Sequence, residues 1–371
     1  EALRCVKGRR KASTSASAMV TRPEEETDAP APAPALAEVA VREAKLSIVS
    51  LLPSLTEIVA ELGLGEHLVG ITHECDHPRE VVRGKCVVTE SYINPKLSQK
   101  EINDSVALSL VENNSLYALR EAALEKLMPT HVLTQSLCDV CAVSFDQVEM
   151  KCARLLSQTP YKLLSIEPES LEDVRTSIET VGKALWPSCT DEKIQAAVHR
   201  FDKKRTEIRG KVEEKLKLND KEEVAAAVGG GAAAAGDPER RRRRPRVAML
   251  EWFDPLFYGG HWIQEMVEDA GGEYSLACKG ERSKAMTPDD LKTYDPDVIV
   301  LAPCGFSTER CVKDAKTILC KKDGPNYKWW SALKAVKSNQ VFATDGNQFF
   351  SRPSPRLVHG IAILANILHG V

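Results

Sequence analysis

The order of strand-like and helical runs is the feature of this sequence that most constrains its fold. Short apolar runs bounded by turn residues alternate with apolar residues at helical spacing in two stretches, 46–169 and 246–371. Between them, residues 170–212 have helical spacing without a strand-like run. The sequence therefore predicts an α/β protein of two lobes, each with a mostly parallel sheet, bridged by one long helix or two helices in line.

Two further segments lack the composition of a packed domain. Residues 1–45 combine basic, acidic and Ala-Pro runs, which predict a flexible leader. Residues 213–245 are of low complexity and include five consecutive arginines, 240–244. The alternatives for that segment are a polyanion-binding arm and a solvated surface insertion, and the formal net charge of −3 favours the insertion and makes nucleic acid an unexpected partner.

Cysteine content and the absence of a long apolar run bear on the compartment. Eleven cysteines, an odd number, are spread from Cys5 to Cys320 in a chain too large to need disulfides. No run reaches the roughly 18–20 apolar residues that a membrane helix requires. The basic start of the chain fits either a transit-peptide remnant or a disordered tail. We expect a soluble protein of a reducing compartment, cytoplasm or an organelle such as the chloroplast, rather than the periplasm.

Polar or aromatic motifs follow directly on the predicted strands. They lie at 53–54, 73–77, 135–141, 255–262, 303–306 and 345–356. In open parallel sheets, ligands bind outside the carboxyl ends of the strands. Motifs from the two lobes would then face each other, which predicts a ligand cleft between the lobes.

Aromatic side chains are concentrated after the predicted strand 247–252. Only 5% of the chain is aromatic, yet this one loop carries, beside His261, the residues Trp252, Phe253, Phe257, Tyr258 and Trp262. Packing beneath the loop would account for any one of them. The cluster as a whole indicates a surface that holds something flat or bulky.

Cysteine and histidine side chains at the same strand ends suggest a second kind of site. Cys138 and Cys141 form a C-x-x-C pair, and Cys75, Cys304 and His261 lie in the corresponding loops. These residues could hold Zn or Fe, although buried structural cysteines are the commoner outcome. The other cysteines are assigned to packing or surface: Cys5, Cys86, Cys152, Cys189, Cys278, Cys311 and Cys320. No catalytic motif is present.

Several segments are similar to a known family when taken in order. Residues 50–57, 69–72 and 76–78 resemble the opening of the cobalamin-binding members of the substrate-binding proteins with a helical backbone, the vitamin-binding partners of ABC importers. Residues 259–262, 297–300 and 350–356 match that family's carboxyl-terminal lobe. A cysteine-rich subgroup is more similar and shares 73–76, 137–142 and 303–306.

The resemblance implies a rigid pair of lobes that bind a corrin ring edge-on without catalysis. Carried over by position, the family's contacts fall on Pro53, Ser54, His73, Glu74, Cys75, Asp76, His261, Trp262, Phe349, Phe350 and Arg352. The other strand-end motifs add Trp252, Tyr258, Gly305 and Phe306. His261 or His73 is the candidate imidazole for cobalt. From the residues alone, Arg352 and Arg356 suit either a ligand anion or a structural role in their turn.

The leading hypothesis is therefore binding of cobalamin or a related corrinoid for uptake, trafficking or storage. An ABC-type permease or other membrane partner is implied by the resemblance, and we expect a monomer. The Arg-rich segment and thiol-rich loops depart from the family's exported importers. Two alternatives stay open, namely binding of a metal ion or metal chelate by the Cys and His residues, and a thiol-dependent corrinoid or redox enzyme.

Overall fold

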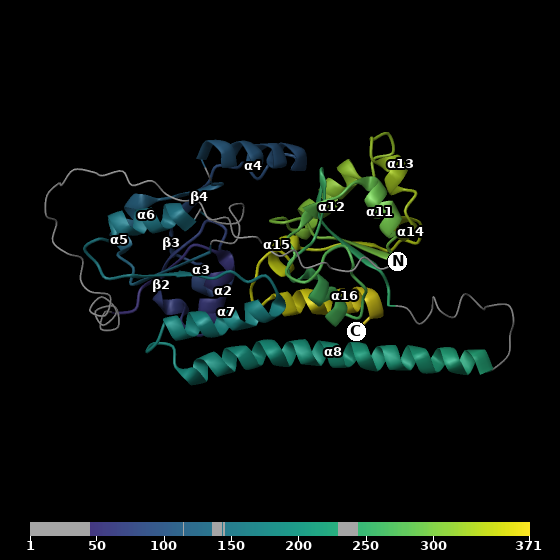
Figure 1. Ribbon diagram of the computed structural model, residues 1–371, viewed down its shortest axis with the longest axis horizontal. Helices are drawn as coiled ribbons and strands as arrows, with labels where there is room; N and C mark the ends of the chain where they lie inside the picture. The colour runs from purple at the N-terminus through teal and green to yellow at the C-terminus, as the bar shows by residue number, and fades with distance from the viewer. Residues whose placement is uncertain (1–44, 114, 136–142, 144, 229–243) are drawn as a thin grey trace, which may run out of the picture.

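The computed structural model describes residues 45–113, 115–135, 143, 145–228 and 244–371, which form two α/β lobes lying side by side (Figure 1). The first lobe is built on a parallel sheet of order β3-β2-β1-β6-β7. Its central strand β1 is fully buried, as its Ile-Val-Ser sequence suits a strand covered on both faces. The strands are β1 (Ile48–Ser50), β2 (Leu68–Ile71), β3 (Cys86–Val87), β6 (His131–Thr134) and β7 (Lys162–Ser165).

Helices cover both faces of the first sheet. Pro53 begins the helix after β1, where its missing N–H costs no helical hydrogen bond, and Gly63, at φ +70°, follows the helix end. The helices of this lobe are α2 (Pro53–Glu61), η1 (Gly65–His67), α3 (Arg79–Val82), α5 (Glu121–Leu127) and α6 (Phe145–Leu155). A small antiparallel pair, β4 (Thr89–Ser91) and β5 (Tyr117–Leu119), flanks the helix α4 (Gln99–Asn113).

The second lobe has a mixed sheet of order β10-β9-β8-β11-β12. Three neighbouring strands are parallel: β8 (Val247–Phe253), β11 (Val298–Leu301) and β12 (Val341–Ala343). The strands β9 (Leu256–Tyr258) and β10 (Lys284–Ala285) pair antiparallel. The helices are α10 (Ile263–Asp269), α11 (Pro288–Tyr294), α12 (Thr308–Ile318), α13 (Tyr327–Trp330), α14 (Lys334–Lys337), α15 (Gly346–Phe349) and α16 (Leu357–His369).

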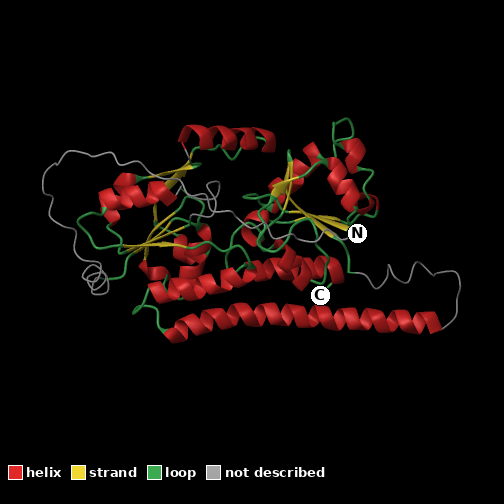
Figure 2. Ribbon diagram, viewed as in Figure 1, coloured by secondary structure: helices red, strands yellow, loops and turns green. Residues whose placement is uncertain are grey.

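Two helices connect the lobes, α7 (Leu171–Ala184) and α8 (Asp191–Val228), and they lie side by side rather than in line (Figures 1 and 2). Pro187 falls in the short turn between them, where it cannot continue α7. The helix α8 then runs along both lobes and continues to Val228, beyond the boundary expected at residue 212. The Glu-, Lys- and Ala-rich sequence after 212 has high helix propensity, which accounts for the extension.

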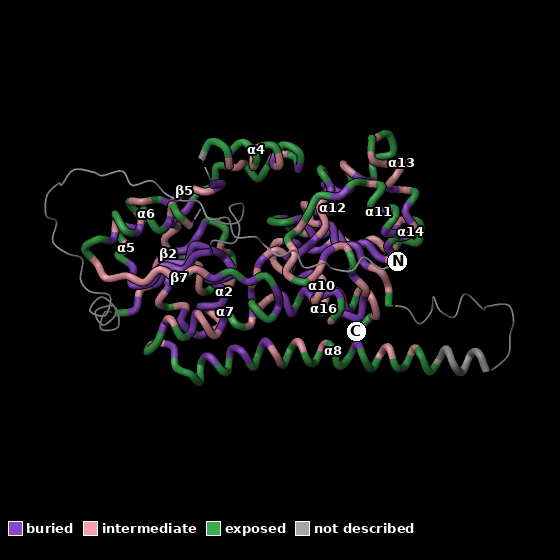
Figure 3. The backbone as a smooth tube through the Cα atoms, viewed as in Figure 1, coloured by how far each residue is buried: buried purple, intermediate pink, exposed green. Residues whose placement is uncertain are grey.

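One apolar core joins the lobes and their connecting helices. It includes Ile58 on α2, Ile178 on α7, Val198 on α8 and Ile361 on α16. Figure 3 shows the buried residues concentrated in the two sheets and on the inner side of the helices, whereas α4 has exposed residues along its whole length. The shared core and α8 together restrict how far one lobe can move relative to the other.

Candidate functional site

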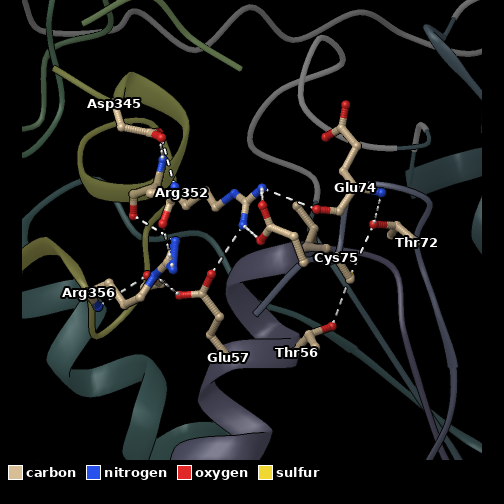
Figure 4. A network of polar contacts seen from close by, with 12 residues as sticks. Thr56, Glu57, Thr72, Glu74, Cys75, Asp345, Arg352 and Arg356 are labelled. Atoms are coloured by element: carbon tan, nitrogen blue, oxygen red, sulfur yellow. Dashed lines mark hydrogen bonds and ion pairs between the residues drawn. The ribbon is translucent and has the colours of Figure 1, made fainter. Parts of the chain in front are cut away.

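The strand-end loops of both lobes meet at their interface, where Arg352 is the central polar residue. Its guanidinium lies in the turn between α15 and α16 and is 7% exposed. It donates to Asp76 Oδ1 at 2.5 Å and Oδ2 at 3.3 Å, to Glu57 Oε1 at 3.3 Å and to the Glu74 carbonyl oxygen at 3.1 Å. Figure 4 shows this side chain reaching from the second lobe into the first. Arg352, predicted as a ligand contact, is therefore fully engaged by protein groups.

Glu57 and Arg356 extend this contact into the protein interior. The Glu57 carboxylate on α2 is 4% exposed, and its Oε2 lies 3.2 Å from Arg356 Nε without hydrogen-bond alignment. Arg356 also donates to the Gln348 carbonyl oxygen at 3.1 Å. Two guanidiniums and two carboxylates thus balance in charge across the interface, which is the condition under which buried ions are tolerated.

The loop after β2 presents a thiol and a carboxylate in different directions. The Cys75 Sγ lies 3.1 Å from both Thr56 Oγ1 and Thr72 Oγ1, and burial raises the pKa of the thiol. The Glu74 carboxylate points away from the arginine (Figure 4) and lies 3.4 Å from the Tyr117 hydroxyl, which donates to it. Cys75 is thus a protonated packing residue, whereas Glu74 is exposed.

His73 and the first turn of α2 complete the predicted contacts of the first lobe. The His73 ring is exposed, its Nδ1 lies 2.8 Å from Thr89 Oγ1, and its centroid is 5.5 Å from that of Tyr117. Pro53 and Ser54 are buried at the start of α2, so a ligand could reach little of their side chains. His73 is therefore the more accessible of these predicted residues.

A second polar contact between the lobes involves Gln99, the first residue of α4. The side chain is 0% exposed; its oxygen accepts from the Phe253 N–H at 2.7 Å and its amide donates to Asp314 Oδ2 at 3.1 Å. The Gln99 carbonyl accepts from Trp252 Nε1 at 3.2 Å. Nearby, Arg310 donates to the carbonyl oxygens of Pro95 and Leu97. The segment 95–99 of the first lobe is thus bound to the second lobe by hydrogen bonds.

Trp252 and Phe306 form an aromatic wall where that segment meets the second lobe. Their ring centroids are 5.2 Å apart at 48°, and the Arg310 guanidinium lies 4.5 Å from the Phe306 centroid. Trp252 is half-buried, whereas Phe306 is buried. Exposed Gly305, at φ +74°, lies immediately before Phe306. Of the predicted aromatic contacts, Trp252 offers a partly open ring face beside the first lobe.

The remaining predicted aromatic contacts, from β9 to the end of α15, differ in burial. Trp262 is 6% exposed and donates its indole N–H to the Phe350 carbonyl at 2.8 Å, and Phe350 itself is 1% exposed. Both are therefore core residues rather than open ligand contacts. Tyr258 and Phe349 are half-buried, and the Phe349 ring lies 5.5 Å from the Arg356 guanidinium and 6.4 Å from the His359 ring, measured from its centroid.

His261 lies at the turn of this loop, with its ring stacked on Trp262 at a centroid distance of 5.4 Å. Its backbone is left-handed, at φ +53°, and Nδ1 has no hydrogen-bond partner among the described residues. Burial lowers the pKa of the imidazole, and the Arg282 charge lowers it further, while Glu169 raises it. The ring is therefore neutral at pH 7, the form that coordinates a metal.

Glu251 supports the same loop from beneath. Ser283 Oγ donates to Glu251 Oε2 at 2.6 Å and accepts from the Gly260 N–H at 3.0 Å. Burial raises the pKa of Glu251 to about 7, against the effect of the Ser283 hydrogen bond. A titrating carboxyl is thus linked through one hydroxyl to the residue before His261.

The described residues contain no group of three or more Cys, His, Asp or Glu side chains placed to hold a metal ion. Cys75 is bound to threonines and Cys304 is exposed at the end of β11. Cys138 and Cys141 lie outside the described residues. Cys278, expected to be a packing or surface residue, is disulfide-bonded.

Sequence reasoning missed the functional contacts of Gln99, Arg310 and Glu251. The Ser98-x-x-Glu101 pattern is a capping box, which would have placed Gln99 at a helix start. Glu251 is a lone carboxylate inside the apolar run of β8, which signals a buried titratable group. For Arg310, nothing in the local pattern indicates a contact with a segment more than 200 residues away.

Comparison with known proteins shows the fold. No protein-family model and no curated protein matches the sequence. Among solved structures, the periplasmic vitamin B12-binding protein BtuF of Vibrio cholerae matches with a TM-score of 0.55 and 17% identity, over 87% of this chain and 96% of that chain. A periplasmic heme-binding protein from Pseudomonas aeruginosa matches with a TM-score of 0.56 and 14% identity, over 87% and 92%.

A further match is a possible iron-binding periplasmic solute-binding protein from Staphylococcus epidermidis, with a TM-score of 0.55 and 18% identity, over 87% of this chain and 98% of that chain. These similarities confirm the predicted periplasmic-binding-protein-like fold of two α/β lobes. Vitamin B12, heme and iron are the ligands named for those three proteins, and at 14–18% identity the similarities show the fold alone.

The expectation of a reducing compartment, cytoplasm or organelle, is wrong. The similar solved proteins are periplasmic, and the disulfide at Cys278 is a bond that persists in oxidising surroundings. The inference failed because an odd cysteine count does not prevent a pair within the set from being oxidised. Within the described ranges, no helix combines the length and apolar character needed to cross a membrane.

Proposed function

We propose that this protein binds cobalamin or a related corrinoid between its two lobes, without catalysis, for uptake, trafficking or storage. The observation that carries the proposal is the half-buried Trp252 ring at the interface, paired with Phe306 and held by the Gln99 carbonyl of the other lobe. A flat, largely apolar macrocycle is the ligand that such a partly open aromatic face suits. The fold shared with the B12-binding protein BtuF supports the same ligand class.

His261 is the residue that we propose as a ligand of the corrinoid cobalt. Its lowered pKa keeps the imidazole neutral, and its buried Nδ1 has no partner among the described residues. The ring stacks on Trp262, and the preceding Gly260 backbone lies close to the Glu281 carbonyl. His73 is the alternative ligand: its Nδ1 is hydrogen-bonded to Thr89, which leaves Nε2 as the atom that could coordinate cobalt.

The test is a titration of the purified protein with hydroxocobalamin, with heme and ferric ion in parallel, following tryptophan fluorescence and the visible cobalt band. We expect one-to-one binding of the corrinoid, and weaker binding by Trp252→Ala than by Trp329→Ala, a control outside the interface. Tighter binding of heme or ferric ion, with no corrinoid saturation, would reject cobalamin while leaving solute binding in place.

The coordination hypothesis has its own readout in the same titration. If His261 binds cobalt, His261→Ala shifts the bound cobalt band toward that of the free corrinoid, while His73→Ala leaves it in place. An unchanged band and affinity in His261→Ala removes His261 as a ligand. A partner permease follows from this function as a further proposal, tested by co-purification of the corrinoid-loaded protein with membrane transport subunits.

A further inference from the structure

A pocket of about 320 Å³ lies in the second lobe, apart from the interface between the lobes. It opens between α12 and the segment 330–339. Residues of β11 and β12 form its floor. All of its lining residues belong to the second lobe. The volume is at the lower end of the range of about 300–1,000 Å³ found for small-molecule sites.

The inside of the pocket is apolar. Its most buried lining residues are Leu301, Ala315 and Trp330, which are 3%, 7% and 2% exposed. Half-buried Val312, Val336, Val341 and Ala343 form the walls. Two of these positions are alanine, and larger side chains there would fill the space. Trp330 supplies a broad rigid surface, as in many sites for apolar groups.

The position of β12 explains why the pocket is open. This strand is the edge of its sheet, so no strand of the described residues pairs with its outer side. Val341 and Ala343 point to the same face as Leu301, which pairs with Ala343. The short helix α14 ends at Lys337 and leaves this end of the core uncovered.

The rim of the pocket is polar and basic. Lys316, Cys320 and Asn339 are its exposed lining residues. No carboxylate of the described residues forms an ion pair with Lys316, although Lys321 and Lys334 each have one. Between residues 313 and 337 the chain has seven lysines and two aspartates, Lys313, Lys316, Lys321, Lys322, Lys328, Lys334 and Lys337 against Asp314 and Asp323.

Asp314 does not reduce the positive charge at the rim, because Arg310 and Gln99 engage it on the other side of α12. A ligand for this pocket must therefore combine an apolar body with a negative group that reaches Lys316. Asn339, held at φ +55° beside the same opening, adds an amide donor for that group.

We propose that this pocket binds a small amphiphilic carboxylate, with its apolar body against Trp330 and Leu301 and its carboxylate at Lys316. The proposal does not depend on the function of the interface between the lobes, because the two sites share no residues. A neutral molecule of the same apolar size should bind more weakly, since it gains burial but no contact with the lysine.

The test uses octanoate and 1-octanol with the full-length protein. The exposed Cys320 thiol lies on the rim, so a bound molecule should slow its alkylation by iodoacetamide, measured by mass spectrometry of the Cys320 peptide. Cys304, also exposed but outside the lining of the pocket, is the internal control. We expect octanoate to protect Cys320 in a saturable way, to leave Cys304 unaffected, and to bind more tightly than 1-octanol.

Variants separate this site from general electrostatic attraction. Lys316→Gln should weaken octanoate about threefold to fivefold, the effect of a largely exposed ion pair, and leave 1-octanol unchanged. Lys322→Gln, a neighbouring lysine outside the lining, should change neither. Ala343→Phe should abolish protection by filling the pocket, and Val336→Phe provides the same test from α14 if the first variant is unfolded.

Three results would overturn the proposal. One is equal protection of Cys304 and Cys320, which would indicate a global change rather than occupancy. Another is an equal loss of octanoate binding in Lys316→Gln and Lys322→Gln. The third is full protection in a folded pocket-filling variant, because binding would then occur elsewhere.

Discussion

Arg352 of the second lobe donates to both carboxylate oxygens of Asp76 in the first lobe, Nη1 at 2.5 Å and Nη2 at 3.3 Å. The same Nη1 lies 3.3 Å from Glu57, which is almost fully buried. A bidentate ion pair of this kind fixes the relative orientation of the two side chains as well as the distance between them. The turn between α15 and α16 is therefore held in one place against α2 and the loop after β2.

Glu57→Gln should destabilise the protein by about 3 kcal/mol, because it leaves the buried Arg352 with the half-exposed Asp76 as its carboxylate and removes the carboxylate that pairs with Arg356. The measurement is the free energy of unfolding in urea. Asp76→Asn, in the same network but with a carboxylate 49% exposed, should cost about 1 kcal/mol or less. Equal losses in the two variants would contradict the view that burial decides the cost.

Gln99→Ala should loosen the contact of α4 with the second lobe. The Phe253 N–H, on a residue 2% exposed, loses its acceptor, and Asp314 loses a donor. An unsatisfied buried N–H costs about 1–3 kcal/mol. Hydrogen exchange at the Phe253 amide should accelerate accordingly. Lys100→Ala, the next residue of α4, removes only an exposed pair with Asp104 and should leave this amide protected.

The two-lobe fold could be predicted because each strand is a short apolar run that ends in a turn signal. The run before Pro53 and the run before Trp252 each indicate a strand by themselves, independently of distant residues. The arrangement of the connecting helices could not be predicted in the same way. Pro187 marks a break, but whether the next helix continues in line or reverses depends on apolar contacts such as those of Ile178 and Val198.

The candidate site could be predicted from the sequence by region rather than by residue. The strand-end rule predicted the loops of His73, Trp252 and His261, and of these three side chains Trp252 has a hydrogen bond to the other lobe, to the Gln99 carbonyl. The rule could not predict which aromatic side chains are buried in the core. Trp262 and Phe350 are two of these, and the Trp262 indole N–H donates to the Phe350 carbonyl oxygen. Nor could it show that Arg352 is already paired, since its partners lie 276 and 295 residues away in the sequence.

Two glycines near the interface should respond differently to alanine. A Cβ at Gly260 would lie 2.3 Å from the Glu281 carbonyl oxygen, which belongs to backbone and cannot rotate away. Gly260→Ala should cost about 2–3 kcal/mol and displace His261. At Gly305, φ is +74° and no atom lies within 4 Å of the added carbon, so Gly305→Ala should cost about 1–2 kcal/mol from backbone strain alone.

The measurement for this pair is thermal and urea unfolding, together with corrinoid binding by the folded fraction. Only Gly260→Ala should alter the cobalt band, because only that change moves the loop of His261. A larger loss of stability in Gly305→Ala than in Gly260→Ala would show that the close approach at Glu281 relaxes easily.

Glu251 should make stability fall as pH rises from about 4.5 to 7. Its pKa is raised from the ordinary value to about 7 by burial, so the folded state holds the proton more tightly than the unfolded state. The contribution is fully present below the unfolded pKa and is lost as pH rises through the folded pKa. The loss is at most on the order of 3 kcal/mol.

Glu251→Gln cannot ionise, so its stability relative to the wild-type protein should increase across this window and level off above pH 7. Urea unfolding at intervals from pH 4.5 to 8 measures the difference. Glu281→Gln on the same loop is the control, because hydrogen bonds from the Cys278 N–H and Lys284 lower the pKa of Glu281. The difference in the free energy of unfolding between this variant and the wild-type protein should therefore not change with pH in this range. Parallel drifts in both variants would show that the loop, rather than the Glu251 proton, responds to pH.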